Sequence, residues 1–167
     1  SVFIIVGCVN AVNLTDGIDG LATGVTLPVM LFFTLVSMTA KQWGLATFPA
    51  TLVGALGGFL FYNFYPAKTF MGDTGSMFLG GAVVAISFGT ERPVLLLLAG
   101  ITYFAEALSD ILQVAHYKRT KKRLFKMAPL HHHFEMCGWS EQKIVLVFSG
   151  VAALGSLLAL LPIIFNK

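Results

Sequence analysis

The sequence predicts an all-α polytopic membrane protein: one transmembrane domain over residues 1–167, with about six transmembrane helical segments, the first truncated. Its composition excludes other classes, because 56% of the residues are hydrophobic and only 11% are charged, whereas soluble domains carry about 25% charged residues. Disordered chains are poor in apolar residues, and a soluble globule of this length cannot bury so much apolar surface. The apolar runs lack the period-two alternation of barrel strands, so helices are expected to satisfy the backbone within the bilayer.

The first predicted segment is short. Residues 1–9 are apolar but too few to cross a bilayer, which takes about 20 helical residues. No basic n-region or cleavage site marks a signal peptide. We therefore interpret this segment as the end of a span that begins upstream, and the chain as a fragment.

Four further apolar runs have spanning length, and a shorter glycine-rich run lies among them. The long runs are residues 21–40, 44–65, 93–115 and 144–165. Pro93 falls in the first turn of its run, where a missing N–H is harmless. The shorter run, residues 76–89, is expected to span only with little tilt or in a locally thinned bilayer.

The loops between these segments fall into two sets that differ in basic residues. The first set comprises residues 10–20, 65–75 and 117–143, and the second comprises residues 41–43, 91–92 and 166–167. The first carries eight Lys and Arg residues, and the second carries three. Because cytoplasmic loops are richer in Lys and Arg, we expect the first set, with its catalytic loops, in the cytoplasm and the C-terminus on the other side.

The first of these cytoplasmic loops combines acidic residues with glycines. Asp16 and Asp19 precede Gly17 and Gly20, so the backbone can turn tightly and approach a ligand closely. One interpretation is that Asp19 only caps the helix that follows. The other is that the loop, with Asn13, binds a polar ligand and offers a carboxylate to a hard cation such as Mg²⁺.

The second loop carries Asp73 between two glycines, directly before a helix. Asp73 is either a helix N-cap or the ligand of a divalent cation that meets phosphates at the helix N-terminus. Phe70, three residues earlier, is either an aromatic residue of the membrane interface or a platform for a ligand.

The third loop holds a basic run, residues 118–126, followed by the consecutive His131, His132 and His133. The basic run is typical of a topology determinant that contacts anionic lipid headgroups, and it can also attract a polyanionic nucleotide. Adjacent histidine side chains point in different directions, so we favour phosphate recognition or loop structuring over a zinc site.

Polar residues also interrupt the fourth long run. Glu106, Asp110, Gln113 and Tyr117 are spaced so that they share one helix face. Carboxylates within a membrane normally face a cavity or a partner, but hydrogen bonding between helices explains them equally well. A cation transporter that uses Glu106 and Asp110 as a relay is an alternative of a different class, and a binding module without catalysis is another.

Three motifs resemble those of the polyprenyl-phosphate N-acetylhexosamine-1-phosphate transferases. They are residues 10–21 (NAVNLTDGIDGL), 70–76 (FMGDTGS) and 127–135 (MAPLHHHFE). The last motif, with Gly138-Trp139 after it, is similar to the branch of the family that acts on UDP-MurNAc-pentapeptide. The resemblance covers nearly the whole chain in order.

The resemblance implies a bacterial inner-membrane enzyme of peptidoglycan synthesis. Such an enzyme transfers phospho-MurNAc-pentapeptide from its UDP carrier to undecaprenyl phosphate, forms lipid I, releases UMP, depends on Mg²⁺ and is a homodimer. A GlcNAc-1-phosphate transferase of the same family is the alternative within this fold. We favour direct attack by the lipid phosphate over an acyl-phosphate intermediate.

Residue by residue, the resemblance implies that Asp73 is the metal ligand and that Phe70 stacks on uracil in a uridine pocket. It also implies a set of catalytic residues. The catalytic positions are Asp73, His131, His132, His133 and Asp16. The substrate-binding positions are Asn13, Gly17, Ile18, Asp19, Asn63, Phe70 and Gln113.

The family has ten spans, and this chain matches its C-terminal part from the fifth span on. The earlier half of the family carries an adjacent Asp pair and a Lys that are assigned to metal binding or activation of the nucleophile. We therefore expect the fragment alone to be inactive.

Overall fold

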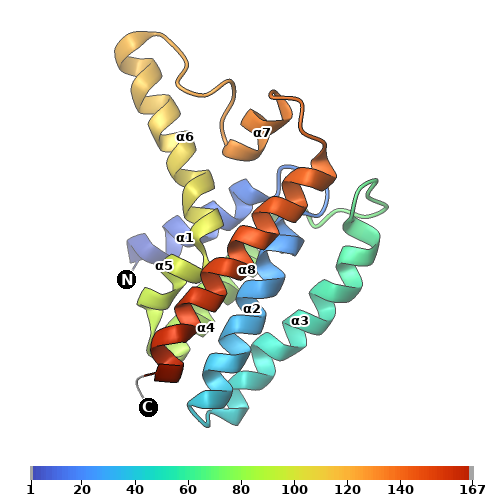
Figure 1. Ribbon diagram of the computed structural model, residues 1–167, viewed down its shortest axis with the longest axis vertical. Coiled ribbons are helices and arrows are strands. Elements are labelled where there is room, and N and C mark those ends of the chain that lie inside the picture. The colour runs from blue at the N-terminus through green and yellow to red at the C-terminus, as the bar shows by residue number, and fades with distance from the viewer. Residues whose placement is uncertain (1, 166–167) are drawn as a thin grey trace.

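The computed structural model describes residues 2–165, and every regular element in that range is helical (Figure 1). The elements are α1 (Val2–Thr15), α2 (Leu21–Thr39), α3 (Trp43–Asn63), α4 (Gly72–Gly89), the 3₁₀ helix η1 (Pro93–Leu95), α5 (Leu96–Ala99), α6 (Ile101–Thr120), α7 (Leu130–Glu135) and α8 (Glu141–Phe165). The predicted all-α class is confirmed.

Helix α2 is the most deeply buried of the long helices. Val25, Val29 and Phe33 recur at helical spacing and are 0% exposed, so they form an apolar stripe in the core. Helices α3 and α8 pack along α2 (Figure 1).

Helix α1 packs against α4 at a close crossing. A Cβ added to Gly80 of α4 would lie 2.7 Å from the Cα atom of Val9 in α1. Only glycine therefore allows the two backbones to come this near. This crossing brings the end of α1 beside the start of α4.

Each of the six predicted segments contains helix, but not every helix is long and apolar enough to cross a membrane. Within the described range, α2, α3 and α8 meet both conditions, and the bent pair Pro93–Ala99 and Ile101–Thr120 makes a fourth span if it is counted as one. Helix α1 is shorter than these helices. These spans support a multi-pass membrane protein.

The single run predicted at residues 93–115 is not one straight helix. The chain bends by 77° between η1–α5 and α6, and α6 continues to Thr120. The break lies at Gly100, where a Cβ would lie 2.8 Å from the carbonyl oxygen of Leu96. The prediction of an uninterrupted segment was wrong because hydropathy does not register such a bend.

Two predicted loop boundaries also need correction. Helix α1 runs on to Thr15, so Asn10 and Asn13 lie on a helix and not in the loop predicted at residues 10–20. Helix α4 begins at Gly72, earlier than the apolar run. In both places the helical backbone continues through polar residues, whereas the apolar run marks only the buried part of the helix.

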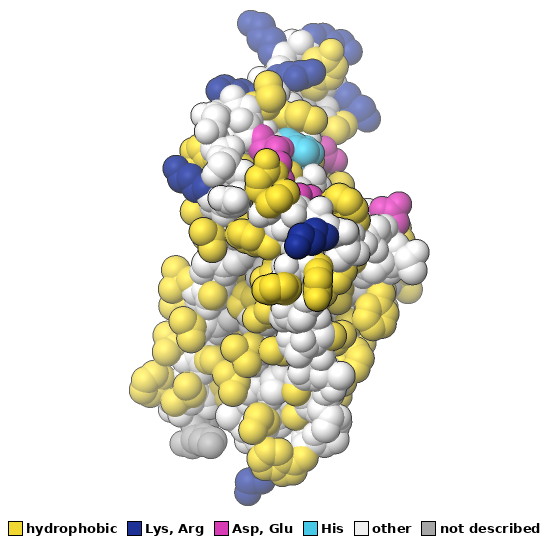
Figure 2. All heavy atoms as spheres, turned by 90° about the vertical axis from the view of Figure 1, so that its right-hand side faces the viewer, with side chains coloured by type: hydrophobic (Ala, Val, Ile, Leu, Met, Phe, Trp, Pro, Cys, Tyr) yellow, Lys and Arg dark blue, Asp and Glu magenta, His cyan; other side chains and the backbone are white. Residues whose placement is uncertain are grey.

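The two loop sets lie at opposite ends of the molecule. Figure 1 shows the connections after α1, α3, α6 and α7 at one end, called here the loop-rich end, and those after α2 and α4 at the other. Figure 2 shows that most Lys and Arg side chains on its face gather at the loop-rich end, above a largely apolar body. Residues 166–167, predicted to belong to the other end, lie outside the described residues.

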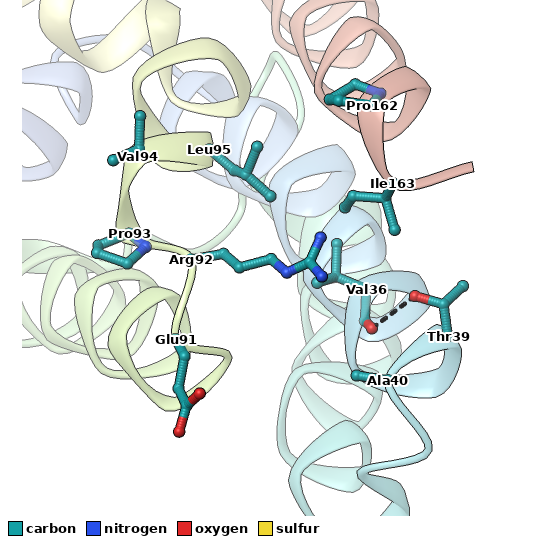
Figure 3. Close-up of a pocket in the computed structure, with 10 residues that line it drawn as sticks. All are labelled: Val36, Thr39, Ala40, Glu91, Arg92, Pro93, Val94, Leu95, Pro162 and Ile163. Atoms are coloured by element: carbon teal, nitrogen blue, oxygen red, sulfur yellow. Dashed lines mark hydrogen bonds between the residues drawn. The ribbon is translucent and has the colours of Figure 1, made fainter. Parts of the chain in front are cut away.

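The opposite end contains a cavity of about 600 Å³ between the ends of three helical segments. Arg92 extends from the connection before η1 toward Val36 and Thr39 in the last turns of α2, and Pro162 of α8 lies across from it (Figure 3). A cation near the C-terminus of a helix is favourable, and Arg92 extends toward the last turns of α2.

Candidate functional site

Three segments that are distant in the sequence meet at the loop-rich end. The turn after α1 contacts both the segment between α3 and α4 and the short helix α7, as the hydrogen bonds and close approaches below establish. The acidic and imidazole groups singled out in the sequence therefore gather in one region.

Asp73 lies in the first turn of α4 and is held by the end of α1. The Nδ2 atom of Asn13 donates to Asp73 Oδ1 at 3.2 Å and to the hydroxyl of Ser76 at 2.8 Å. No side-chain hydrogen bond caps α4 within the described residues, so Asp73 is not an N-cap. Its carboxylate is oriented by Asn13 and lies where the helix dipole favours negative charge.

Asp16 lies close enough to Asp73 for their charges to interact. Burial, and to a smaller extent repulsion from Asp73, together raise the pKa of Asp16 to about 6. Two nearby carboxylates repel each other when both are charged, and a bound cation would offset this repulsion. Their oxygens are also the ligand type that Mg²⁺ prefers.

The described residues could supply only part of a metal coordination shell. Within residues 2–165 no three His, Cys, Asp or Glu side chains are grouped closely enough to hold a metal ion by themselves. Magnesium is usually bound by one or two carboxylates together with waters and substrate phosphates, so Asp73 and Asp16 fit this ion.

The histidine triplet lies on α7, and its three side chains have different surroundings. His131 is 1% exposed and contacts Glu106 of α6 through its Nδ1 atom at 3.0 Å. His132 pairs with Glu135, and His133 accepts a hydrogen bond from the backbone N–H of Lys126 at 3.1 Å.

Gly17 allows His131 to reach the turn after α1. A Cβ on Gly17 would overlap the Nε2 and Cε1 atoms of His131. A residue with any side chain at this position would push the ring away. The turn that carries Asp16 is thus in contact with α7.

Asp19 ties the same turn to the segment between α3 and α4. Its Oδ2 atom accepts a hydrogen bond from the backbone N–H of Ala67 at 2.9 Å. The alternative that Asp19 caps α2 was wrong, since the cap is Gly20 in a left-handed conformation with φ of 78° and no side-chain cap hydrogen bond. Ile18 packs against the hydrophobic core.

The side chain of Asn63 holds the backbone just before Phe70, in the segment that precedes α4. Asn63 is buried, and its amide accepts from Thr23 at 2.8 Å and donates to the carbonyl of Thr69 at 3.0 Å. Phe70, which follows Thr69 in the chain, is 73% exposed. Asn63 therefore supports the backbone beside an exposed aromatic ring, and both polar atoms of its amide already have a protein partner.

Gln113 has protein partners as well. Its Oε1 atom accepts from the N–H groups of Leu124 and Phe125, and its Nε2 atom donates to the carbonyl of Phe125. It lines a cavity of about 560 Å³ that also contains Asp110. In this structure Gln113 holds the loop after α6.

Sequence reasoning missed two contributors. Ser76 shares the Asn13 amide with Asp73, and although it ends the motif at residues 70–76, it was not singled out. The partner of Glu106 was also missed, although a carboxylate in an apolar helix requires one, and the histidine triplet was a candidate.

The chain is similar to known proteins over most of its length. The family model described as glycosyl transferase family 4 matches residues 1–90. A phospho-N-acetylmuramoyl-pentapeptide-transferase of Clostridium acetobutylicum is 55% identical over 98% of this chain and 51% of its own length. Proteins with the same name from Carboxydothermus hydrogenoformans and Clostridioides difficile are 58% identical over 89% and 87% of this chain, respectively, and 46% of their own lengths. The chain thus spans about half the length of the curated relatives it matches.

Proposed function

Because the chain belongs to glycosyl transferase family 4, we propose that it is part of a phospho-N-acetylmuramoyl-pentapeptide transferase. The reaction moves phospho-MurNAc-pentapeptide from UDP-MurNAc-pentapeptide to undecaprenyl phosphate and yields lipid I and UMP. The names of the relatives support this choice.

The acidic pair is the proposed Mg²⁺ site. Asp73 and Asp16 would hold the ion, and the chemistry it would supply is neutralisation of diphosphate charge and polarisation of the phosphorus. Asn13 orients the Asp73 carboxylate through its amide. Phosphoryl transfer depends mainly on positioning and charge neutralisation, and these are the tasks that fixed carboxylates and a buried imidazole perform.

The exposed ring of Phe70 is the proposed platform for the uracil base. Its exposed fraction of 73% leaves a face free for stacking. Asn63 supports it by holding the carbonyl of the preceding residue. The Asp16–Asp19 turn completes the uridine pocket.

The proposed location is the bacterial inner membrane, with the site on the cytoplasmic face. The excess of Lys and Arg at the loop-rich end supports this orientation (Figure 2). We further propose that the complete protein is a homodimer. Because the chain spans about half of its relatives, the tests below use the complete gene product.

The observation that carries this proposal is the contact between Asn13 and Asp73 beside Asp16. Asp73→Asn removes the ion's ligand but keeps the shape and the hydrogen-bonding capacity of the side chain. We expect UMP release to fall by about 10²–10³-fold, a loss of the order that removing one electrostatic stabiliser causes. The measurement is UMP release with both substrates and Mg²⁺.

Glu91→Gln is the matched control, because Glu91 is an exposed carboxylate at the opposite end of the bundle. It should turn over at the wild-type rate. Full activity in the Asp73→Asn variant, with the same thermal unfolding as the wild type, contradicts the proposed role.

The choice of donor separates the two transferases of this family. We expect UMP release from UDP-MurNAc-pentapeptide and not from UDP-GlcNAc. Turnover of UDP-GlcNAc alone would replace this proposal with a GlcNAc-1-phosphate transferase.

A further inference from the structure

One of the three histidines of α7 has a buried ring nitrogen without a hydrogen-bond partner. His131 is buried, and its Nε2 atom makes no hydrogen bond within the described residues. Buried polar atoms without a partner are rare in proteins. His132 and His133 differ in burial, since each is half-buried, and their Nδ1 atoms contact Glu135 and the backbone N–H of Lys126, respectively.

Glu106 holds His131 through two atoms. Its Oε2 atom lies 3.0 Å from Nδ1 of the ring, and its Oε1 atom accepts the backbone N–H of His131 at 3.2 Å. Glu106 is 0% exposed, so water does not compete for these bonds. The backbone N–H is one of the free donors at the start of α7.

This arrangement determines which ring nitrogen carries the hydrogen. An ionised carboxylate only accepts hydrogen bonds, so Nδ1 must donate and therefore carries a hydrogen. The Nε2 atom has no hydrogen-bond partner, and it is the atom closest to where a Cβ on Gly17 would lie. Gly17 directly follows Asp16, whose carboxylate interacts with Asp73.

We propose that Glu106 is a positioning residue that fixes His131 with its hydrogen on Nδ1 and presents Nε2, which then accepts, to a hydrogen-bond donor of the sugar-nucleotide substrate beside the Asp16–Gly17 turn. The inference rests on the proposed function for the identity of the ligand. It also assigns different tasks to the three histidines, because among them only His131 has a buried ring nitrogen without a partner, and this nitrogen lies against the turn that carries Asp16.

Glu106→Gln tests the assignment with almost no change of shape. The backbone N–H of His131 can only donate, so the amide oxygen must face it. The amide NH₂ group then faces Nδ1 and forces that atom to accept, which moves the ring hydrogen to Nε2. The substitution therefore reverses the tautomer without emptying the site.

The tautomer is read from the ring ¹⁵N shifts of His131 in the complete protein, with histidine labelled and the signal assigned by His131→Asn. We expect a hydrogen on Nδ1 in the wild type and on Nε2 in Glu106→Gln. An Nδ1 hydrogen in both proteins, or an Nε2 hydrogen in the wild type, overturns the proposal.

A double-mutant cycle tests whether Glu106 acts through Nε2. His131→Asn keeps a donor for Glu106, since the asparagine NH₂ group lies near the former Nδ1, but it has no atom at Nε2. Glu106→Gln should lower kcat by about 100-fold, within the range that orienting partners of histidine contribute. In the His131→Asn background the same change should have no further effect. An equal loss in both backgrounds overturns the proposal.

Asp110→Asn is the control on the same helix. Asp110 lies one turn from Glu106 and lines a separate cavity, so its loss should change neither kcat nor the His131 shifts. The same effect as Glu106→Gln would contradict a specific contact.

The two proposals fail in different ways. If the wild type carries the Nδ1 hydrogen but releases no UMP from either donor, the transferase proposal fails and the orientation of His131 stands. If UMP is released but the tautomer is insensitive to Glu106→Gln, the positioning role fails and the transferase proposal stands.

Discussion

Asp16 is destabilising when it is charged without a counterion. Burial, and then repulsion from Asp73, raises its pKa to about 6 from the ordinary value of 3.8. A carboxyl whose pKa is raised on folding contributes stability that is fully present below its unfolded pKa and is lost as the pH rises through its folded pKa. The wild type should therefore lose stability between about pH 4 and pH 7.

Asp16→Asn removes this pH dependence. With EDTA present, we expect the variant to gain about 1 kcal/mol of stability relative to the wild type between pH 4 and pH 7.5; this figure is reduced from the full shift because the side chain is partly exposed. Thermal unfolding in detergent measures the difference. A gap that is the same at both pH values contradicts the assignment.

Magnesium provides the second arm of this experiment. At pH 7.5 a cation between the two carboxylates offsets their repulsion, so Mg²⁺ should raise the unfolding temperature of the wild type more than that of Asp16→Asn. Equal stabilisation of both proteins would remove Asp16 from the metal site. This readout does not depend on catalysis.

The sequence could predict which acidic and histidine residues gather, but not what each side chain contacts. Asp73, Asp16 and the histidines follow from three motifs. The amide oxygen of Asn63 accepts from the hydroxyl of Thr23 on another helix, and that of Gln113 accepts from the N–H of Phe125 in the folded loop after α6. Such partners are set by tertiary packing, which no local pattern encodes.

The crossing of α1 and α4 places Asn13 against Asp73. Gly80 and Val9 are in backbone contact at this crossing, and one turn further along Asn13 meets Ser76. The distance between the two helices is therefore set by a glycine on one of them. A larger residue there is expected to separate the helices that hold the site.

Gly80→Ala tests this dependence. The added Cβ would lie 2.7 Å from a backbone atom of Val9, which cannot rotate away as a side-chain end can. We expect a loss of about 1–3 kcal/mol in stability, as in overpacked cores, measured by thermal unfolding in detergent.

Gly81→Ala is the matched control on the same helix. A Cβ on Gly81 meets no atom within 4 Å, and alanine is favoured over glycine in a helix by about 0.5–1 kcal/mol. It should be neutral or stabilising. If the two variants lose equal stability, the close approach of α1 and α4 is not the cause.

Apolar runs predicted the middles of the helices but not their ends or the bend. The run at residues 93–115 is interrupted at Gly100, and α1 extends past its apolar part to Thr15. Glycine within a helical pattern is compatible with a straight helix, a close contact or a break. Only the packing of Leu96 and Tyr103 around Gly100 selects the break here.

The two ends of the molecule differ in charge and in polar content. Lys and Arg gather with the acidic and histidine residues at the loop-rich end (Figure 2). The opposite end presents short connections around the cavity that contains Arg92 (Figure 3). The loop alternation read from the sequence agrees with this separation, because each span carries the chain from one end to the other.

The orientation in the membrane can be tested with one cysteine at each end. Cys137 is exposed at the loop-rich end, whereas Cys8 is buried. Ala40 is exposed at the opposite end, so Ala40→Cys combined with Cys137→Ser moves the reactive thiol across the molecule. Because the basic end is expected inside, a membrane-impermeant maleimide should label Ala40→Cys in intact cells. It should label Cys137 of the wild type only after permeabilisation. Labelling of Cys137 in intact cells would show the reverse orientation, in which the acidic pair cannot reach a cytoplasmic nucleotide donor. Labelling of both thiols only after permeabilisation would exclude a bundle that spans the membrane.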